Sequence, residues 1–369
     1  MSLEDLRAQI DDLDQRIIAL LKQRADISHQ IGEEKNSLGL PVYDPQREAL
    51  LLDSLTAGDL GRLDAEAVAA IYREILSASR ALQRRTSVAY LGPEYTFSHL
   101  AAVKQFGAGC QLLAQPTIDE VFSTVERGNA DFGMVPIENV IQGVETRTLD
   151  SFIESPLLIC GEVYVDVHIC LLASGELDQV RRVHSHPQPL AQCRQWLRVN
   201  LPQAEAITAP STSAAAATVA AAQDPSQAAL ATAAAAEHYG LKVLAHNVED
   251  QPNNRTRFFV IGNTAPERTG MDKTSVLFTT RHRSGALYAA LAPFSAHQIS
   301  LTLIQSRPSP AKLEGPYIFY VDFEGHQDDL AVRQALSELR ELTQTLKVLG
   351  SYPQAHHRQP ARSPRPAPS

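Results

Sequence analysis

Residues 3 to 35 carry a heptad pattern of apolar side chains, which is typical of one long helix with an apolar stripe. The apolar positions alternate in steps of three and four, with one member missing: Leu3, Leu6, Ile10, Leu13, Ile17, Leu20, Ile27 and Ile31. At about 1.5 Å of rise per residue this helix is about 50 Å long, too long for a three-helix monomer to cover. We therefore expect the stripe to pair with a second copy of itself in a helical homodimer.

The missing member of the stripe is a charged residue. Arg24 stands where the pattern asks for Leu or Ile, and Lys35 follows on nearly the same face, about 16 Å away at the backbone. Long side chains from both can converge on one small dianion. Arg7 is about 25 Å from Arg24 along the axis, so these two can share a ligand only across an antiparallel dimer. From periodicity alone, Arg24 could equally carry its charge out to solvent.

Two shorter helices complete an all-helical unit that ends near Arg85. Asp44 is the expected N-cap of the first, followed by Pro45, and Asp64 is the expected N-cap of the second. Ser79 falls where the apolar stripe of the second helix should continue, and Gln83 lies one turn beyond it. Both could instead be tolerated surface polar residues.

The rest of the chain changes texture twice. From residue 87 to about 263, strand-like and helical runs alternate, with a capping box from Thr117 to Glu120, which indicates an α/β domain. Its long strand-like run, VYVDVHICLLAS (163–174), would suit a chain crossing between two lobes with a cleft. After Met271 the order is βαββαβ, typical of a ferredoxin-like α+β domain. The tail is expected to be disordered.

Composition argues against several classes of function. The net charge is −9 without a basic run, which disfavours a nucleic-acid surface. No apolar stretch approaches the roughly 20 residues that span a bilayer, and the start is too polar for a signal peptide, so we expect a cytoplasmic protein. The four cysteines show no C-x-x-C spacing, which disfavours disulfides and zinc. His184 and His186 could be read as metal ligands, but no third ligand is evident.

Polar loops at expected strand ends raise a question of chemistry. In NNRTRFFVIG (253–262), an apolar strand has a polar mouth around Thr256; in isolation this threonine would be a strand cap. Further polar loops are GPEYTFSH (92–99), PIEN (136–139), SHPQP (185–189) and STS (211–213). STS precedes an alanine-rich helix, so its N–H groups and hydroxyls would form an anion site. We interpret the alanine runs as helix filler.

The polar spacing on the three helices resembles the all-helical chorismate mutase family, and the remainder resembles prephenate dehydratase with a C-terminal ACT domain. The whole chain thus resembles the bifunctional chorismate mutase/prephenate dehydratase family. The resemblance implies an all-α mutase domain (1–86) in a domain-swapped dimer, a two-lobed α/β dehydratase domain (87–265) of periplasmic-binding type, a ferredoxin-like ACT domain (272–354) and a disordered tail (355–369). It implies no metal and no organic cofactor.

For the mutase, the resemblance assigns each polar residue a contact with chorismate. Lys35 and Gln83 act on the ether oxygen as catalytic residues. The substrate-binding residues are Arg7 from the partner chain, Arg24, Asp44, Arg47, Glu48 and Ser79, with the arginines and Ser79 on carboxylates and Glu48 on the ring hydroxyl. This intramolecular rearrangement needs no nucleophile or acid, only a held conformer and stabilisation of the charge on the oxygen.

For the dehydratase, the signature is Thr256-Arg257-Phe258. The resemblance ties Thr256 to loss of the ring hydroxyl of prephenate; because a threonine hydroxyl is a poor acid, we interpret it as a relay or hydrogen-bond donor. The implied substrate-binding residues are Thr96, Glu138, Asn139, Gln188, Ser211, Thr212, Ser213, Arg257 and Phe258, with the STS loop on the pyruvyl carboxylate. Tyr95 stands where the family usually has glycine, which narrows the first loop.

The resemblance also implies that phenylalanine binds between the ACT domains of two subunits. The implied effector residues are Gly285, Ala286 and Leu287 at a helix start and Gln305, Ser306, Arg307 and Pro308 on the next strand. Gln305 replaces the family's glutamate. Two rivals stay open: an arogenate-preferring dehydratase, and a non-enzymatic amino-acid-sensing regulator. Arg24 at a seam position disfavours the regulator, because a helix that only dimerises would be apolar there.

Overall fold

The computed structural model describes residues 2–38, 42–309, 315 and 317–355 of the chain. The expected disordered tail lies outside these residues, except for its first position. Contacts divide the chain into two units, Met1–Met134 with His168–Pro252, and Val135–Val167 with Asn253–Ser369. Strand β3 (Phe132–Asn139) contributes residues to both units.

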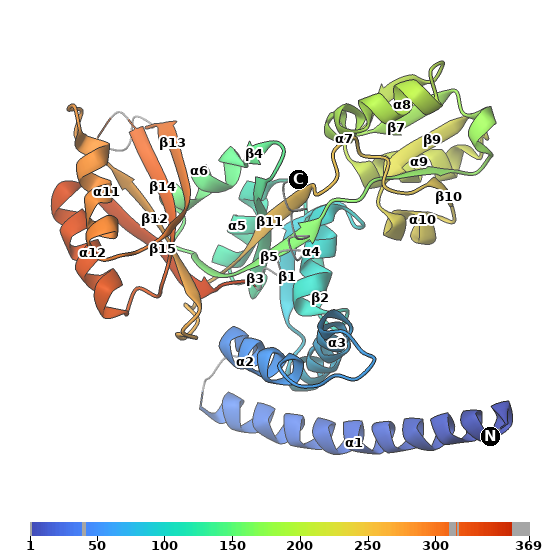
Figure 1. Cartoon of the computed structure of the whole chain (residues 1–369), viewed down its shortest axis with the longest axis horizontal. Coiled ribbons are helices and arrows are strands. Elements are labelled where there is room, and N and C mark those ends of the chain that lie inside the picture. Colours follow the sequence, from blue (N-terminus) through green and yellow to red (C-terminus); the bar gives the residue numbers. More distant parts are fainter. Residues whose placement is uncertain (1, 39–41, 310–314, 316, 356–369) are drawn as a thin grey trace, which may run out of the picture. The chain divides into compact units, whose positions relative to one another are not determined.

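Three helices open the first unit: α1 (Leu3–Ser37), α2 (Pro45–Thr56) and α3 (Ala65–Gln83) (Figure 1). The heptad pattern correctly predicts α1 as one continuous helix of 35 residues. The N-caps expected at Asp44 and Asp64 are also confirmed, since their carboxylates accept the backbone N–H groups of Arg47 and Ala67.

The apolar stripe of α1 is exposed in the single chain. All eight of its Leu and Ile residues are at least 43% exposed, and within this fully described helix Ser28 alone is buried. Contiguous apolar surface on this scale marks an interaction site.

A parallel strand group follows the helices. Its elements are β1 (Ser87–Leu91), α4 (Phe97–Phe106), β2 (Gln111–Gln115) and α5 (Ile118–Glu126). Strand β1 pairs in parallel with β2 on one side and with the start of β3 on the other, and its central residues Val88 to Tyr90 are buried. Thr117 caps α5 by accepting the N–H of Glu120, which confirms the helix start expected there.

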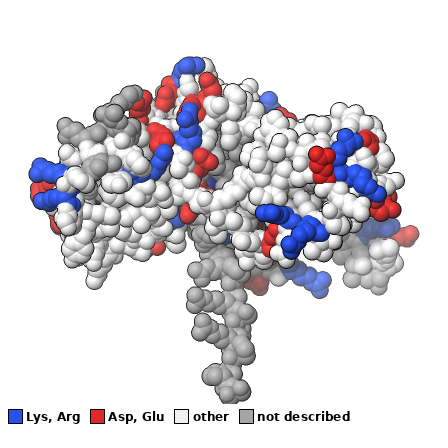
Figure 2. Space-filling model, turned by 90° about the horizontal axis from the view of Figure 1, so that it is seen from above, with Lys and Arg blue, Asp and Glu red and all other residues white. Residues whose placement is uncertain are grey.

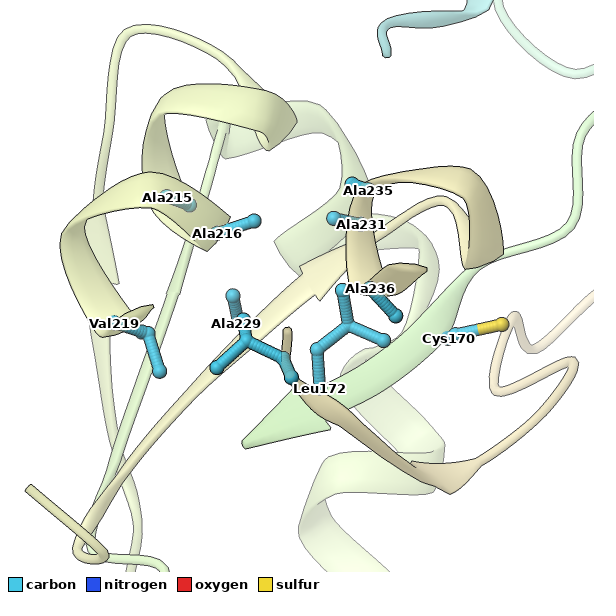
Figure 3. Packing of buried hydrophobic residues seen from close by; sticks show 10 residues of the cluster. Cys170, Leu172, Ala215, Ala216, Val219, Ala229, Ala231, Ala235 and Ala236 are labelled. Atoms are coloured by element: carbon cyan, nitrogen blue, oxygen red, sulfur yellow. The ribbon is translucent and has the colours of Figure 1, made fainter. Parts of the chain in front are cut away.

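The remainder of the first unit is a second α/β fold. Its elements are β6 (Cys170–Ala173), a 3-10 turn (Leu177–Gln179), β7 (Arg182–Ser185), α7 (Pro187–Gln192), α8 (Arg194–Asn200), β8 (Glu205–Thr208), α9 (Thr212–Ala222), β9 (Gln227–Ala231), α10 (Ala233–Tyr239) and β10 (Lys242–Ala245). The strand order is β10-β6-β9-β7-β8. Its core is rich in alanine: Ala215 and Ala216 of α9 lie near Ala229 of β9 (Figure 3). The alanine runs are therefore more than helix filler, because small side chains let these helices pack closely on the sheet.

The sequence predicts one long strand over residues 163–174, and this prediction is wrong. The structure has two strands there, β5 (Leu158–Asp166) and β6, in different sheets. The N–H of Val167 still follows the β5–β11 register and donates to the carbonyl of Asn254 at 2.8 Å, whereas that of Ile169 donates to the Glu249 carboxylate at 2.9 Å, so the ladder ends between these two residues.

The second unit contains the end of β3 and further strands that belong to two sheets. Its first elements are β4 (Gly143–Val144), α6 (Thr146–Glu154), β5 and β11 (Arg255–Gly262). Strand β11 lies between β3 and β5 and pairs antiparallel with β5. Six consecutive residues of β11, from Arg257 to Gly262, are buried, so the strand carrying Thr256 is an interior element.

The predicted βαββαβ order is confirmed in the rest of this unit. The elements are β12 (Asp272–Thr279), α11 (Ala286–Ala296), β13 (Leu301–Pro308), β14 (Tyr317–Glu324), α12 (Leu330–Leu342) and β15 (Thr345–Pro353), with strand order β13-β14-β12-β15. Strand β15 packs closely against β5: a Cβ on Gly350 would lie 2.4 Å from the carbonyl oxygen of Ile159. Glycine at 350 permits that approach.

Charged side chains form no large patch of one sign on the face in view: Lys and Arg lie in small groups, several beside Asp or Glu (Figure 2). Among the described residues, no helix is long and apolar enough to cross a membrane.

Candidate functional site

Helices α1 and α3 bring Arg24 and Ser79 into contact. Nη1 of Arg24 donates a hydrogen bond to Oγ of Ser79, and that hydroxyl donates to the carbonyl of Ile75 at 2.7 Å. Ser79 is buried and Arg24 is half-buried. The arginine at the seam position therefore points toward α3.

The side chain of Gln83 packs against the last turns of α1, the part of the helix that carries Lys35. A Cβ on Gly32 would lie 2.6 Å from Cγ of Gln83, so α1 needs glycine where the Gln83 side chain packs. Oε1 of Gln83 is buried and makes no hydrogen bond to any described residue. Lys35, one turn beyond Gly32, donates from Nζ to the carbonyl of Val42 at 3.0 Å. Sequence reasoning missed Gly32, although glycine inside a helix is a usable signal.

The remaining mutase residues are in different environments. Arg7 and Arg47 are exposed, and Asp44 caps α2. Glu48 is ion-paired with Arg80, which sequence reasoning did not single out. Burial raises the pKa of the Glu48 carboxyl, and the charge of Arg80 opposes that shift.

In the second unit, one amide joins Thr256 to Asn139. Nδ2 of Asn139 donates to Oγ1 of Thr256 and to Oδ1 of Asn254, both at 2.8 Å. The orientation of this amide is fixed, because Oδ1 of Asn139 accepts the backbone N–H groups of Ile141 and Gln142 at 3.0 and 3.2 Å. The Thr256 oxygen thus accepts one hydrogen bond, which leaves its own hydrogen to point at another acceptor.

Asn254 is a further polar residue that sequence reasoning missed. It is 2% exposed, and its Nδ2 is buried without a hydrogen bond to any described residue. The doubled asparagine before the Thr-Arg-Phe signature was the available signal.

The structure places Arg257 among buried protein groups. It is 3% exposed, and its guanidinium donates to Glu162 at 2.7 Å, to Asp322 at 2.6 Å and to the Tyr352 hydroxyl at 3.0 Å. Burial alone would lower the pKa of Arg257, but the charges of Asp322 and Glu162 help raise it well above its ordinary value. Three of its five N–H donors thus bind protein groups.

Strand geometry gives the reason. Successive side chains of a strand point to opposite faces, so Arg257 lies on the face opposite to Thr256 and Phe258. Lys273 of β12 adds a second cation, 3.0 Å from Glu162. Phe258 is fully buried.

The other expected dehydratase residues cap or flank helices and strands. Thr96 caps α4, and Ser211 caps α9 by accepting the N–H of Ala214 at 3.0 Å. Thr212 and Ser213 are buried, and the Ser213 hydroxyl lies 3.2 Å from that of Tyr239. Two more are placed as follows: Gln188 is exposed in the first turn of α7, and Glu138 is half-buried in β3 opposite Val144.

Tyr95 has a backbone conformation that explains the family's glycine. Its φ is 64°, in the left-handed region where residues with a Cβ are uncommon. Two contacts hold it there: its ring stacks on His238 with centroids 4.2 Å apart, and its carbonyl accepts the Thr232 hydroxyl at 2.9 Å. Stacking on His238 therefore accommodates a tyrosine at the position where the family usually has glycine.

In the ACT region, Gly285 is the N-cap of α11, with a φ of 76° and open space where a Cβ would lie. Ala286 is buried, and Leu287 packs on the core of this domain. On β13, Gln305 donates to the carbonyl of Ser306 at 3.2 Å. Arg307 is bound by Asp150 at 2.5 Å and by the carbonyl of Thr146 at 2.8 Å.

Three protein families match successive regions of the chain. Residues 6–84 match chorismate mutase type II, residues 88–266 match prephenate dehydratase and residues 274–341 match the ACT domain. The bifunctional chorismate mutase/prephenate dehydratase of Aquifex aeolicus (strain VF5) is 44% identical over 358 residues, which cover 96% of this chain and 98% of the relative.

Two solved structures resemble most of the chain. The prephenate dehydratase of Arthrobacter aurescens in complex with L-Phe is 34% identical with a TM-score of 0.68, covering 73% of this chain and 90% of its own. GqqA, described as a novel type of quorum quenching acylase, is 30% identical with a TM-score of 0.67, covering 73% and 98%. The near full-length similarity to the Aquifex protein shows that the chain belongs to the family of bifunctional chorismate mutase/prephenate dehydratases.

Proposed function

We propose that the helical region of this chain rearranges chorismate to prephenate and that its α/β region converts prephenate to phenylpyruvate, under control by phenylalanine. The observation that carries the proposal is that the polar residues expected for each reaction meet across long sequence distances. Arg24 contacts Ser79, 55 positions later, and Asn139 contacts Thr256, 117 positions later.

For the mutase, the geometry supports a site of fixed cations and one amide. In the rearrangement a carbon–oxygen bond breaks as a carbon–carbon bond forms in the same molecule, so catalysis consists of holding a compact conformer and stabilising charge on the ether oxygen. Lys35 and Gln83 supply the donors to that oxygen. Gln83 packs against Gly32 near the end of α1, and Lys35 donates to Val42 in the segment after the helix. Arg24, Arg47 and Ser79 hold carboxylates, while Glu48 takes the ring hydroxyl next to Asp44.

The mutase site is completed by a second copy in this proposal. The exposed stripe of α1 pairs with α1 of the partner in a domain-swapped dimer. Pairing brings the Arg7 of one chain to the Arg24 of the other, which one chain cannot do over about 25 Å of helix.

Mixing two inactive variants tests this arrangement. Arg7→Ala and Arg24→Ala homodimers should both lack mutase activity, but a heterodimer contains one site with both arginines and one with neither. After random re-pairing, about a quarter of all sites are intact, so about a quarter of wild-type activity should return. No recovery, with subunit exchange verified by a tag on one variant, would contradict a shared site.

For the dehydratase, Thr256 is the proposed proton donor or relay. A proton must reach the departing ring hydroxyl, which leaves as water. As carbon dioxide leaves, the electrons of the broken carbon–carbon bond complete the aromatic ring, and the electrons of the carbon–oxygen bond leave with the oxygen. The hydrogen bond that Thr256 accepts from Asn139 directs its own hydrogen away from that amide. The hydroxyl is a poor acid, so it delivers a proton replaced from solvent or from a neighbouring group.

Substrate anions are assigned to the helix start at Ser211. The N-terminus of α9, an 11-residue helix, has the partial positive charge and N–H groups that favour a carboxylate. We propose that Ser211, Thr212 and Ser213 use this end for the pyruvyl carboxylate of prephenate. Thr96, Glu138 and Gln188 are proposed as further polar contacts.

Phenylalanine is the proposed effector of the ACT region, bound between two subunits of a dimer or larger homo-oligomer. Gly285 supports this role because its open space and positive φ let a ligand approach the backbone at the start of α11. The proposal includes the cytoplasmic location expected from the sequence.

Separate assays of the purified protein test the two activities. Chorismate should disappear with formation of prephenate, and added prephenate should give phenylpyruvate. Arogenate in the second assay should give phenylalanine more slowly than prephenate gives phenylpyruvate. Activity with arogenate alone would replace the proposed substrate, and no activity in either assay would overturn the proposal.

A further inference from the structure

Next to Ser79 on α3 lies a buried arginine for which the reaction chemistry has no evident use. Arg80 is 5% exposed. One guanidinium nitrogen, Nη1, donates to Oε1 of Glu48 on α2, and the other, Nη2, donates to the carbonyl of Phe106 at 2.5 Å. The guanidinium carbon also lies 5.2 Å from the centre of the Tyr43 ring, within the range of a cation–π contact.

These partners hold the guanidinium from three sides. Phe106 is the last residue of α4, so its carbonyl belongs to the negative end of a helix dipole, which favours a cation. Tyr43 is buried; its ring centre lies 5.1 Å from those of Phe106 and Phe132, and its hydroxyl accepts from Gln105 at 2.9 Å. Because the guanidinium is planar and its donors are fixed relative to one another, these contacts leave it little freedom to rotate.

We infer that Arg80 is a positioning residue of the mutase: it orients the Glu48 carboxylate toward the ring hydroxyl of the substrate and anchors it to the end of α4. The inference rests on the proposed function, which gives Glu48 that hydroxyl. It assigns to the α4 end, which belongs to the dehydratase region, a part in mutase catalysis. In this proposal Arg80 acts through Glu48 and not on the substrate, since its two terminal nitrogens donate to Glu48 and Phe106.

Electrostatics around Glu48 give this role a distinctive signature. Burial raises the pKa of the Glu48 carboxyl and Asp44, at the start of its own helix, raises it further, whereas Arg80 from α3 and, to a smaller extent, Lys35 from α1 lower it. Removing the charge of Arg80 therefore raises the Glu48 pKa again. More of the carboxyl is then protonated at a given pH, and a neutral acceptor binds a hydroxyl less strongly than a charged one.

The first experiment compares Arg80 of α3 with Arg84, the C-cap residue of the same helix, in the full-length protein. Arg80→Met should lower mutase kcat/KM about tenfold at neutral pH and move the acidic limb of the pH profile to higher pH, so that part of the loss is recovered as pH rises. Arg84→Met is the matched control: Arg84 also pairs with a carboxylate, Asp131 at 2.5 Å, but its side chain is 65% exposed. It should leave the profile unchanged. Dehydratase activity, measured in the same preparations, reports folding.

The second experiment separates positioning from packing. If Arg80 acts through Glu48, then Arg80→Met introduced into Glu48→Gln should change mutase kcat/KM by less than about twofold. This comparison is also informative if Arg80→Met alone fails to fold, because the double variant removes both buried charges. An unshifted acidic limb in Arg80→Met, or a further tenfold loss in the Glu48→Gln background, would overturn the inference while leaving the proposed function intact. Wild-type mutase activity in Glu48→Gln would instead refute the proposed role of Glu48, and the inference with it.

Discussion

Helix α1 and strand β11 both carry residues assigned to chemistry, but they hold them in opposite ways. On α1, the apolar stripe and Arg7 are exposed, and one residue of the helix is buried within the chain. On β11, six consecutive residues are buried, and the hydroxyl of Thr256 is bound by an amide that is itself fixed by two backbone N–H groups.

The chemistry of the two reactions explains this difference. A rearrangement needs cations around a folded substrate, and in the proposed dimer part of that set comes from another chain. A proton transfer depends on one hydrogen reaching one oxygen, so its donor has to be placed within hydrogen-bond reach. The comparison teaches that a surface helix can share a site between subunits, whereas an interior strand has its donor preset within one chain.

The largest expected effect is on Thr256. Thr256→Val keeps the shape of the side chain but removes the hydroxyl, and it should reduce dehydratase kcat by about 10²–10⁴-fold, the range of a positioned proton donor. Prephenate should still bind, because Nδ2 of Asn139 keeps its bond to Asn254. Single-turnover rates and prephenate binding by calorimetry would measure the two separately.

Thr256→Ser is the matched control, since it retains the hydroxyl and should keep part of the rate. Mutase activity should be unchanged in both variants. A valine variant as active as the wild type would mean that the hydroxyl has only a structural role, and β11 would then be no better preset for chemistry than α1.

The second prediction concerns the opposite face of β11. Arg257→Met removes the cation between Glu162 and Asp322 and leaves two buried carboxylates with Lys273 as the remaining cation of the cluster. Breaking a buried ion pair from one side destabilises a protein by about 3–5 kcal/mol. Urea denaturation should therefore show a lower free energy of unfolding for the second unit. A stability within about 0.5 kcal/mol of wild type would show that the cluster does not hold β11.

The third prediction tests whether α1 tolerates what β11 does not. Arg24→Ala should reduce mutase activity by at least about a hundredfold, the scale of losing one transition-state donor, while dehydratase activity survives. Because Arg24 is only half-buried, the free energy of unfolding should fall far less than for Arg257→Met. Equal loss of both activities, with an unchanged circular dichroism spectrum, would contradict separate sites.

How far the sequence predicts these regions depends on how local the cause is. The heptad spacing predicts α1, and the apolar run after Thr256 predicts β11, because both patterns are written within one segment. The N-caps Asp44 and Asp64 follow for the same reason. The alternation of side chains also places Thr256 and Arg257 on opposite faces of the strand.

The partners of these residues could not be predicted from local pattern. Arg257 binds carboxylates 95 and 65 positions away, and nothing in Thr-Arg-Phe distinguishes a buried structural arginine from one that binds substrate. The pairing of Arg80 with Glu48 spans 32 positions. From the sequence, an arginine next to an expected site residue would be predicted to be an ordinary exposed residue on a helix surface. Backbone strain is equally hidden: the positive φ of Tyr95 was signalled only by the glycine that the family has there.

The smallest expected effect lies on β13, a third kind of setting. The residues of this strand alternate between half-buried and exposed, so it presents its residues more openly than β11 does. Gln305 and Arg307 share one face because they are two residues apart. Since Arg307 is already bound by Asp150, a glutamate at 305 would keep its charge for a ligand ammonium group.

Gln305→Glu should therefore tighten inhibition by phenylalanine about tenfold, because a hydrogen bond to a charged group contributes roughly 1.5–3 kcal/mol against about 1 kcal/mol for a neutral one. The uninhibited dehydratase rate should not change, because effector binding acts only through its preference for one conformation. Dehydratase rate against phenylalanine concentration, measured for both proteins, gives the two inhibition constants. Identical curves would place position 305 outside the effector site. No inhibition of either protein would mean that this ACT region serves only the oligomer, and β13 would then resemble α1 as a surface for a second copy.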